Sequence, residues 1–196
     1  MPVDDPSKFA DRFSIESSRL KNWDYSSPGI YFVTICTLNH NKFFGKIIEN
    51  KMCLSLRGQI AQQCIVDIPK HFLNVKILDY VVMPNHLHIL METIPLQLKS
   101  VETHDRASLQ TPPTSLHKKY QSFHFHRLAI KSNQTIPKIV SQFKSSVTRM
   151  CNQHSMFFAW QSRFHDEIVK DDQQLIITKQ YIRNNVANWE KDKFYR

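Results

Sequence analysis

Apolar residues recur along the chain with two different periods, and the two periods predict two kinds of element. Dense apolar and β-branched runs, typical of strands, occupy 30–37, 43–48, 52–56, 75–83 and 86–92. Apolar positions at helical spacing occupy 55–72, 136–151 and 171–189. Together they predict a single-domain α/β sandwich, with a mainly antiparallel sheet and helices packed on it.

Proline and acidic residues indicate where these elements begin and end. Pro69 is predicted to end the first helix, because a proline inside a helix removes a backbone hydrogen bond. Asp171 and Asp172 suit the first turn of the last helix, where they meet the positive end of its dipole. Pro84 and Asn85 interrupt the apolar run that precedes 86–92, so we expect a turn there between two antiparallel strands.

Residues 95–135 differ in composition from the chain on either side of them. They contain adjacent prolines, several Ser, Thr and Gln, and no sustained strand or helix period. A structureless stretch of this length is unusual inside a compact domain. We therefore predict an N-terminal arm at 1–22, one domain built from 23–94 and 136–196, and a flexible basic insertion at 95–135.

The chain is strongly basic for its length. Its 196 residues carry a formal net charge of +9, with an isoelectric point of about 9.4. That charge favours nucleic acid first and a membrane surface second as the partner, although a basic protein that binds neither is the alternative.

The four cysteines form no Cys-x-x-Cys pair, which predicts buried free thiols in a reducing compartment. With no apolar run near the ~20 residues of a membrane helix, we expect a cytoplasmic protein.

His86 and His88 flank Leu87 at the start of a predicted strand. Successive side chains of a strand alternate between its faces, so we expect both imidazoles on one face and Leu87 and Ile89 in the core. Two adjacent imidazoles can hold one metal ion or bind one phosphate. A pair of surface histidines is the alternative, and it is the more frequent origin of an isolated His-x-His.

Tyr181 and Asn185 lie four residues apart in the last predicted helix, so they project from the same side of it. A surface tyrosine beside a polar amide is the alternative interpretation. If this helix packs near His86 and His88, the imidazoles and the amide oxygen form a mixed ligand set. Such a set suits Mn²⁺ or Mg²⁺ more than a closed structural zinc site, and Tyr181 could then attack phosphorus.

These residues also carry a resemblance to a known family. The chain resembles the single-tyrosine HUH transposases, named for a histidine–hydrophobic–histidine motif, and among them the REP-associated tyrosine transposases. The matching stretches follow the order of the family and cover nearly all of the chain outside the predicted arm and insertion. They are 22–37, 68–72, 80–90, 142–144, 160–166 and 181–185.

The resemblance implies a ferredoxin-like α/β fold and a metal-dependent enzyme. His86 and His88 stand where the family binds a divalent metal, Mg²⁺ or Mn²⁺. Asn185 stands where it has a third ligand, and Tyr181 where it has its nucleophile. Such enzymes cut and rejoin single-stranded DNA near hairpins through a covalent 5′-phosphotyrosine. The implied partners are single-stranded or hairpin DNA, such as REP-like or element-end palindromes, and the family includes both monomers and homodimers.

Three positions depart from the family pattern without removing a proposed catalytic group. Val186 replaces the usual proline after Asn185, so we expect the last helix to run on by a turn. His165 replaces an aromatic residue, and Lys170 replaces an arginine. A second histidine motif, at 124–126, lies in the predicted insertion without flanking strand alternation, and we expect no metal there.

Basic residues are the candidates for contact with DNA phosphates. Lys138, Lys144 and Arg149 lie in the helix predicted at 136–151 without an acidic neighbour, although basic helix faces are more often simply solvated. Arg163 and Arg183 are two further candidates. Two other functions stay open: a catalytically inactive or domesticated sequence-specific DNA-binding protein, and a basic α/β metal protein that binds no nucleic acid.

Overall fold

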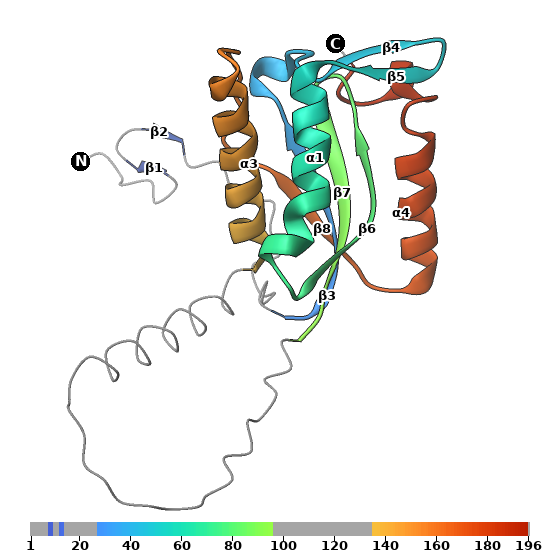
Figure 1. Cartoon of the computed structure of the whole chain (residues 1–196). Helices are drawn as coiled ribbons and strands as arrows, with labels where there is room; N and C mark the ends of the chain where they lie inside the picture. Colours follow the sequence, from blue (N-terminus) through green and yellow to red (C-terminus); the bar gives the residue numbers. More distant parts are fainter. Residues whose placement is uncertain (1–7, 10–11, 14–26, 96–134, 196) are drawn as a thin grey trace, which may run out of the picture.

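A four-stranded antiparallel sheet forms the centre of the computed structural model (Figure 1), which describes residues 8–9, 12–13, 27–95 and 135–195. Its strands are β3 (Gly29–Cys36), β6 (Val75–Val82), β7 (His86–Thr93) and β8 (His165–Val169). They lie in the order β6-β7-β3-β8, and every neighbouring pair is antiparallel. Two small hairpins pair β1 (Lys8–Phe9) with β2 (Arg12–Phe13), and β4 (Gly45–Ile48) with β5 (Lys51–Leu54).

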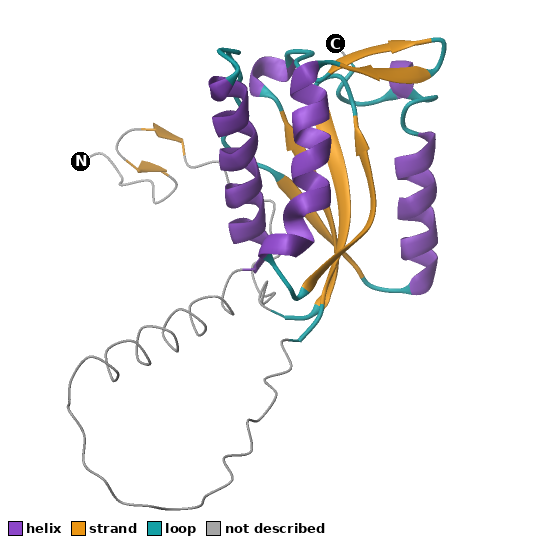
Figure 2. Cartoon of the chain, in the orientation of Figure 1, coloured by secondary structure: helices purple, strands orange, loops and turns teal. Residues whose placement is uncertain are grey.

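Helices cover both faces of the central sheet (Figure 2). α1 (Leu56–His71) and α3 (Thr135–Gln153) pack together on one face, while α4 (Asp172–Asn184) contacts β6, β7 and β8 on the other. In chain order, α1 lies between β3 and β6, and α3 lies between β7 and β8, which is the arrangement of a ferredoxin-like fold. The predicted α/β sandwich with an antiparallel sheet is therefore confirmed.

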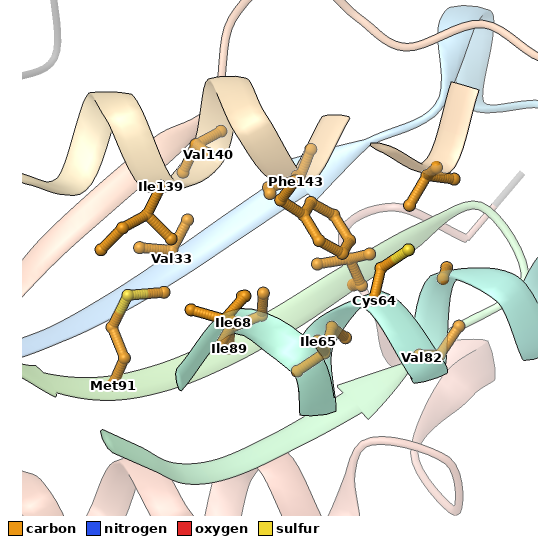
Figure 3. Packing of buried hydrophobic residues seen from close by; sticks show 14 of the residues in the cluster. Val33, Cys64, Ile65, Ile68, Val82, Ile89, Met91, Ile139, Val140 and Phe143 are labelled. Carbon is orange, nitrogen blue, oxygen red and sulfur yellow. The ribbon is translucent and has the colours of Figure 1, made fainter. Parts of the chain in front are cut away.

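Alternation along β7 divides its side chains between the two faces of the sheet. Leu87 and Ile89 belong to the main hydrophobic cluster, which fills the space between the sheet and the pair α1 and α3 (Figure 3). Leu90 points the other way and packs with Ile182 of α4 in a smaller cluster. The predicted placement of Leu87 and Ile89 in the core is therefore confirmed, and the opposite face of β7 is left to the histidines and α4.

The start of α1 packs against backbone, which makes Gly58 important for stability. Ser55 caps the helix by accepting a hydrogen bond from the Gly58 amide. A Cβ atom on Gly58 would lie 2.2 Å from the carbonyl oxygen of Phe44. We expect Gly58→Ala to lower the free energy of unfolding by about 1–3 kcal/mol, because this clash outweighs a helix-propensity gain of about 1 kcal/mol.

Urea denaturation of the full chain measures this change. Gln59→Ala is the matched control, since Gln59 is exposed in the same turn and its truncation should change stability by less than about 0.5 kcal/mol. Equal stability of Gly58→Ala and Gln59→Ala would contradict the close approach of α1 to the Phe44 backbone.

Two predicted boundaries differ from the structure. Pro69 lies inside α1 rather than ending it, because the helix continues past it and Phe72 still donates its amide to the carbonyl of Ile68. The sequence pattern predicts no strand at β8, where only Ile168 and Val169 are apolar. This strand forms because it pairs with β3 along the edge of the sheet, a contact that local sequence does not indicate.

The last helix ends earlier than the pattern predicts. α4 stops at Asn184 rather than near Trp189, and Val186 in place of proline does not extend it. The side chain of Asn188 donates to the carbonyl of Asn184, and the turn that follows buries the ring of Trp189. Burial of that large ring outweighs the gain from another turn of helix.

Several predictions concern residues outside the described part of the chain. These are most of the arm at 1–22, the insertion at 95–135 apart from its two ends, and the histidine motif at 124–126. The division into arm, domain and insertion stays a prediction.

The expected burial of all four cysteines is wrong for Cys53, which lies on the exposed side of the β4–β5 hairpin. Among the helices that the structure describes, none has the length and apolar character needed to cross a membrane.

Candidate metal and nucleophile site

His86 and His88 lie side by side on the α4 face of the sheet. They are two residues apart in β7, so they share the face opposite to Leu87, as the alternation predicts. Both are buried, with exposed fractions of 0% and 1%. Their ring centroids are 4.7 Å apart and their Nε2 atoms are 3.1 Å apart. The strand therefore brings two imidazole nitrogens to one point.

Hydrogen bonds at the other ring nitrogens hold both imidazoles in place. The side-chain nitrogen of Asn85 donates to the Phe194 carbonyl at 2.8 Å, so its Oδ1 accepts from Nδ1 of His86 at 2.9 Å. This bond leaves the lone pair of His86 on Nε2. Nδ1 of His88 lies 2.8 Å from the hydroxyl of Thr34, which can donate or accept. Both rings can therefore present Nε2 to a shared cation.

The spacing of these nitrogens fits a divalent ion. Adjacent ligands of an octahedral ion at about 2.1 Å lie about 3.0 Å apart. That value is close to the 3.1 Å between the two Nε2 atoms. The bonds from Asn85 and Thr34 are of the kind that orients metal-binding histidines in other proteins. The donor set and its surroundings therefore suit a metal.

Helix α4 brings Tyr181 to the same point. Its hydroxyl lies 3.4 Å from Nε2 of His88, and the two rings meet edge to face with centroids 5.3 Å apart. Phe32 packs against both rings from β3. Tyr181 is 40% exposed, in contrast to the buried histidines. One chain therefore brings together the tyrosine and a histidine that lie 93 residues apart in the sequence.

Asn185 follows Tyr181 by one turn and is 3% exposed. It caps α4 with helical backbone angles, so it stays on the side of the helix that carries Tyr181. A hydrogen bond from its side chain to Tyr181 lowers the pKa of the phenol. Its Oδ1 is buried and has no hydrogen-bond partner among the residues that the structure describes. Because an unsatisfied buried carbonyl is costly, this oxygen suits a role as a metal ligand.

Asp192 is a member of the site that the sequence pattern does not reveal. It follows the short 3₁₀ helix η2 (Trp189–Lys191), and its side chain is 3% exposed. Its Oδ2 lies 3.9 Å from Nε2 of His86 and accepts a long hydrogen bond of 3.5 Å from Tyr181. Ligand atoms of Asp192, His86 and His88 all lie within 4.8 Å of one another. No motif or period marks Asp192, because only the turn after α4 brings it here.

Burial and nearby charge shift the ionisation of the site. Burial, assisted by nearby cationic groups, lowers the pKa of His86 to about 3, and burial also holds the pKa of His88 well below its usual value. Both imidazoles are therefore neutral at pH 7, as metal ligands must be. Burial raises the pKa of Tyr181, and the negative charge of Asp192 raises it further. Tyr181 is thus protonated in this arrangement.

The predicted phosphate-binding residues are spread over the two faces of the molecule. Lys144 of α3 is half-buried and donates to the carbonyls of Gln161 and Ser162, so it holds the loop that precedes β8. Arg183 of α4 forms an ion pair with Asp79 of β6 at 3.1 Å. Both cations are already engaged with protein groups, and a phosphate contact would compete with those bonds.

The three other predicted basic residues lie on or near α3. Lys138 is half-buried in the first turns of α3, whereas Arg149 is exposed near its end and Arg163 is exposed just before β8. Arg149 lines an open hollow of about 700 Å³ together with Lys144 and Trp160. The hollow lies on the opposite face of the sheet from α4, so the histidine site and this basic surface are separate features.

The fold defines the structural class of the protein, a ferredoxin-like α/β protein. Among solved structures, it is similar to a REP-associated tyrosine transposase bound to a REP hairpin, with a TM-score of 0.53. The likeness covers 91% of this chain and 77% of the other, at 13% sequence identity. At that identity the likeness establishes the fold and no more.

A protein of Haemophilus influenzae provides the sequence relationship. The two chains are 37% identical over 180 residues, which make up 91% of this chain and 92% of the other, and the function of that protein is uncharacterised. The chain belongs to the same family as this protein. No family model matches this chain.

Proposed function

We propose that the protein cleaves and rejoins single-stranded DNA at hairpins through a covalent 5′-phosphotyrosine on Tyr181. One observation carries this proposal: in a single chain, the Tyr181 hydroxyl lies 3.4 Å from Nε2 of His88, beside His86. At this distance, the tyrosine oxygen and a metal ion held by the histidines could contact the same phosphate. The similar fold of a REP-associated tyrosine transposase, whose structure holds a REP hairpin, supports the same assignment.

The proposed metal is Mg²⁺ or Mn²⁺, with His86, His88 and Asn185 as its ligands. The two imidazoles are neutral, and Oδ1 of Asn185 is a buried oxygen in need of a partner among the described residues. When bound, such an ion would withdraw charge from the phosphoryl oxygens and favour nucleophilic attack. Three protein ligands would leave open positions for the phosphate, as a catalytic site requires.

In the proposed reaction, the oxygen of Tyr181 forms a bond to phosphorus while the bond from phosphorus to the 3′ oxygen breaks. The phenol loses its proton, and the departing 3′ oxygen takes up a proton and becomes a free hydroxyl. The hydrogen bond from Asn185 assists the loss of the phenolic proton, because it lowers the pKa of Tyr181. Attack of a 3′-hydroxyl on the phosphotyrosine reverses the step and joins two strands without ATP.

Charge and surface chemistry support single-stranded or hairpin DNA as the partner. The net charge of +9 favours a polyanion. Arg149 can bind a phosphate, and the ring of Trp160 in the same hollow can stack on an unpaired base. Trp160 pairs with Thr37, which directly follows the partner of His86 on β3, so this hollow reaches the end of the sheet that carries the site. The other basic residues named above stay additional candidates.

Arg149→Ala is expected to weaken binding of hairpin DNA to a similar degree for all sequences. The slope of log affinity against log salt concentration should fall by about 1, because one phosphate contact is lost. Fluorescence anisotropy with a labelled hairpin at several salt concentrations measures the slope. Lys76→Ala is the matched control, since Lys76 is exposed at the far end of β6 from the site. A slope that is the same in both variants and in the wild type would remove Arg149 from the interface.

The proposed function is tested by the covalent product itself. The full chain is incubated with single-stranded hairpin oligonucleotides from its own genome and Mn²⁺ or Mg²⁺, and the mixture is separated under denaturing conditions. A protein–DNA adduct that forms with metal and not with EDTA is the expected result. The absence of an adduct on every such hairpin would overturn the enzymatic assignment.

One observation favours a second function, a DNA-binding protein that keeps this fold without turnover. The buried imidazoles, with exposed fractions of 0% and 1%, offer no surface to DNA in this arrangement. Such a protein would bind hairpin DNA equally well with metal and with EDTA, and it would release no cleaved strand. The enzyme proposed above would release a cleaved strand, and it would do so only in the presence of a divalent metal.

A further inference from the structure

The candidate site is closed to a DNA phosphate from the side of the histidines. His86, His88 and Asn185 are 0%, 1% and 3% exposed, whereas Tyr181 is 40% exposed. A phosphodiester that approaches from solvent can therefore reach the nucleophile, but not the groups proposed to hold the metal. Because cleavage requires one phosphate to meet both, some part of the protein must move before the reaction.

The part that closes the site is the segment 189–195, which follows α4 and is called here the C-terminal segment. Its Trp189 ring stacks on His86 with centroids 6.0 Å apart, and its Phe194 ring lies against His86 at 4.6 Å. The Phe194 carbonyl accepts a hydrogen bond from Asn85, the residue that also orients His86. Trp189 and Phe194 are 8% and 9% exposed, so these two rings shield the His86 imidazole from solvent.

The carboxylate of Asp192 lies between His86 and Tyr181. Its Oδ2 lies 3.9 Å from Nε2 of His86 and 3.5 Å from the Tyr181 hydroxyl, so one carboxylate oxygen faces both halves of the site. Its Oδ1 accepts the backbone amide of Phe194 at 2.7 Å, which fixes the carboxylate in this orientation. A carboxylate and a phosphodiester both present anionic oxygens to a hard cation. The two groups cannot fill the same space at once.

We propose that Asp192 is a built-in substitute for the DNA phosphate, and that the C-terminal segment closes the site until a DNA strand displaces it. This inference rests on the proposed function, because it concerns the same site. In the closed state the carboxylate would be available as an additional ligand for a metal held by His86 and His88. In the open state the scissile phosphate takes its place and contacts Tyr181.

The proposal predicts opposite effects of one substitution on two ligands. Asp192→Asn keeps the shape of the side chain and the bond to the Phe194 amide, but it removes the charge. Without DNA, its affinity for Mn²⁺ should fall by about tenfold or more, because a charged ligand is lost. At saturating Mn²⁺, its affinity for a labelled hairpin and its rate of adduct formation should rise by about tenfold, because the closed state is less populated. Calorimetry, anisotropy and a gel assay measure the three quantities.

Glu190→Gln is the matched control for the loss of one negative charge. Glu190 lies in the same segment but is exposed, so it changes long-range attraction to DNA without touching the site. Effects of Asp192→Asn that equal those of Glu190→Gln would overturn the proposal. Loss of adduct formation by Asp192→Asn at saturating metal would also overturn it, because Asp192 would then act as a base toward Tyr181 rather than as a substitute for phosphate.

Phe194→Ala tests the closure by a readout that needs neither metal nor activity. Diethyl pyrocarbonate acylates exposed neutral imidazoles, and mass spectrometry of peptides reports each histidine separately. In the wild type, His86 and His88 should react far more slowly than the exposed His71, which serves as the internal reference. In Phe194→Ala, His86 should become reactive while His71 stays unchanged, and a circular dichroism melt confirms that the variant is folded. Continued protection of His86 would overturn the closure.

Failure of the proposed function and failure of the closure give different results. If no variant forms an adduct with any hairpin, but Mn²⁺ affinity and histidine reactivity change as predicted, the enzyme assignment fails and the closed site stands. If the wild type forms the adduct and neither Asp192→Asn nor Phe194→Ala changes metal affinity or histidine reactivity, the enzyme assignment stands and the closure fails.

Discussion

Tyr181→Phe is expected to abolish the covalent protein–DNA adduct, with a loss of at least about a thousandfold in its rate of formation. Phenylalanine has no oxygen to bond to phosphorus, whereas its ring can keep the edge-to-face contacts with Phe32 and His88. The hydroxyl makes only long contacts, at 3.4 Å to His88 and 3.5 Å to Asp192, so stability should change by less than about 1 kcal/mol. Denaturing gel electrophoresis measures the adduct, and a thermal melt measures stability.

Tyr80→Phe provides the control for this experiment. Tyr80 lies on β6, and its hydroxyl accepts a hydrogen bond from Gln62 of α1, on the opposite face of the sheet from α4. Loss of that hydroxyl should leave adduct formation unchanged. An adduct formed by Tyr181→Phe at the wild-type rate would place the nucleophile elsewhere in the chain, and peptide mapping of the adduct would then identify it.

The second large effect is expected on the affinity for the proposed metal ion. His88→Ala should lower the affinity for Mn²⁺ by at least about a hundredfold, because loss of a ligand exceeds the 10–100-fold effect of changing an outer-shell partner. Adduct formation at fixed metal should fall with it. Isothermal titration calorimetry on the full chain measures the affinity directly, without DNA.

Two further variants separate loss of the ligand from loss of structure. His88→Phe fills the space beside Phe32 but offers no ligand atom, so it should lose metal as His88→Ala does while retaining more stability. His71→Ala removes an exposed histidine at the end of α1 and should bind Mn²⁺ like the wild type. Wild-type affinity in both His88 variants would show that the metal does not bind at this histidine pair.

Features that depend on neighbouring residues could be predicted from the sequence. The common face of His86 and His88 follows from the alternation of a strand, and the structure keeps it. The helix α1 follows from its apolar spacing and from Ser55, whose side chain caps it. In both cases the determining contacts lie within a few residues of each other, so the sequence pattern contains them.

Features that depend on distant contacts could not be predicted in this way. β8 has only two apolar residues, Ile168 and Val169, and it becomes a strand because β3 offers it an edge for pairing. The sequence pattern predicts that the last helix continues to about Trp189, but α4 ends at Asn184 because the ring of Trp189 is buried against His86 instead. The energy that decides both cases comes from surfaces far away along the chain.

The chemistry of the candidate site shows the same division. Residue type and local spacing made His86, His88, Tyr181 and Asn185 candidates, because the geometry of one strand and one helix determines which face carries each pair, and the family resemblance suggested their roles. Tertiary structure alone decided that the tyrosine hydroxyl lies 3.4 Å from His88 in the same chain, across a separation of 93 residues. It alone brought Asp192 into the site, since the hydrophobic packing of the C-terminal segment, which no local pattern encodes, determines where that carboxylate lies.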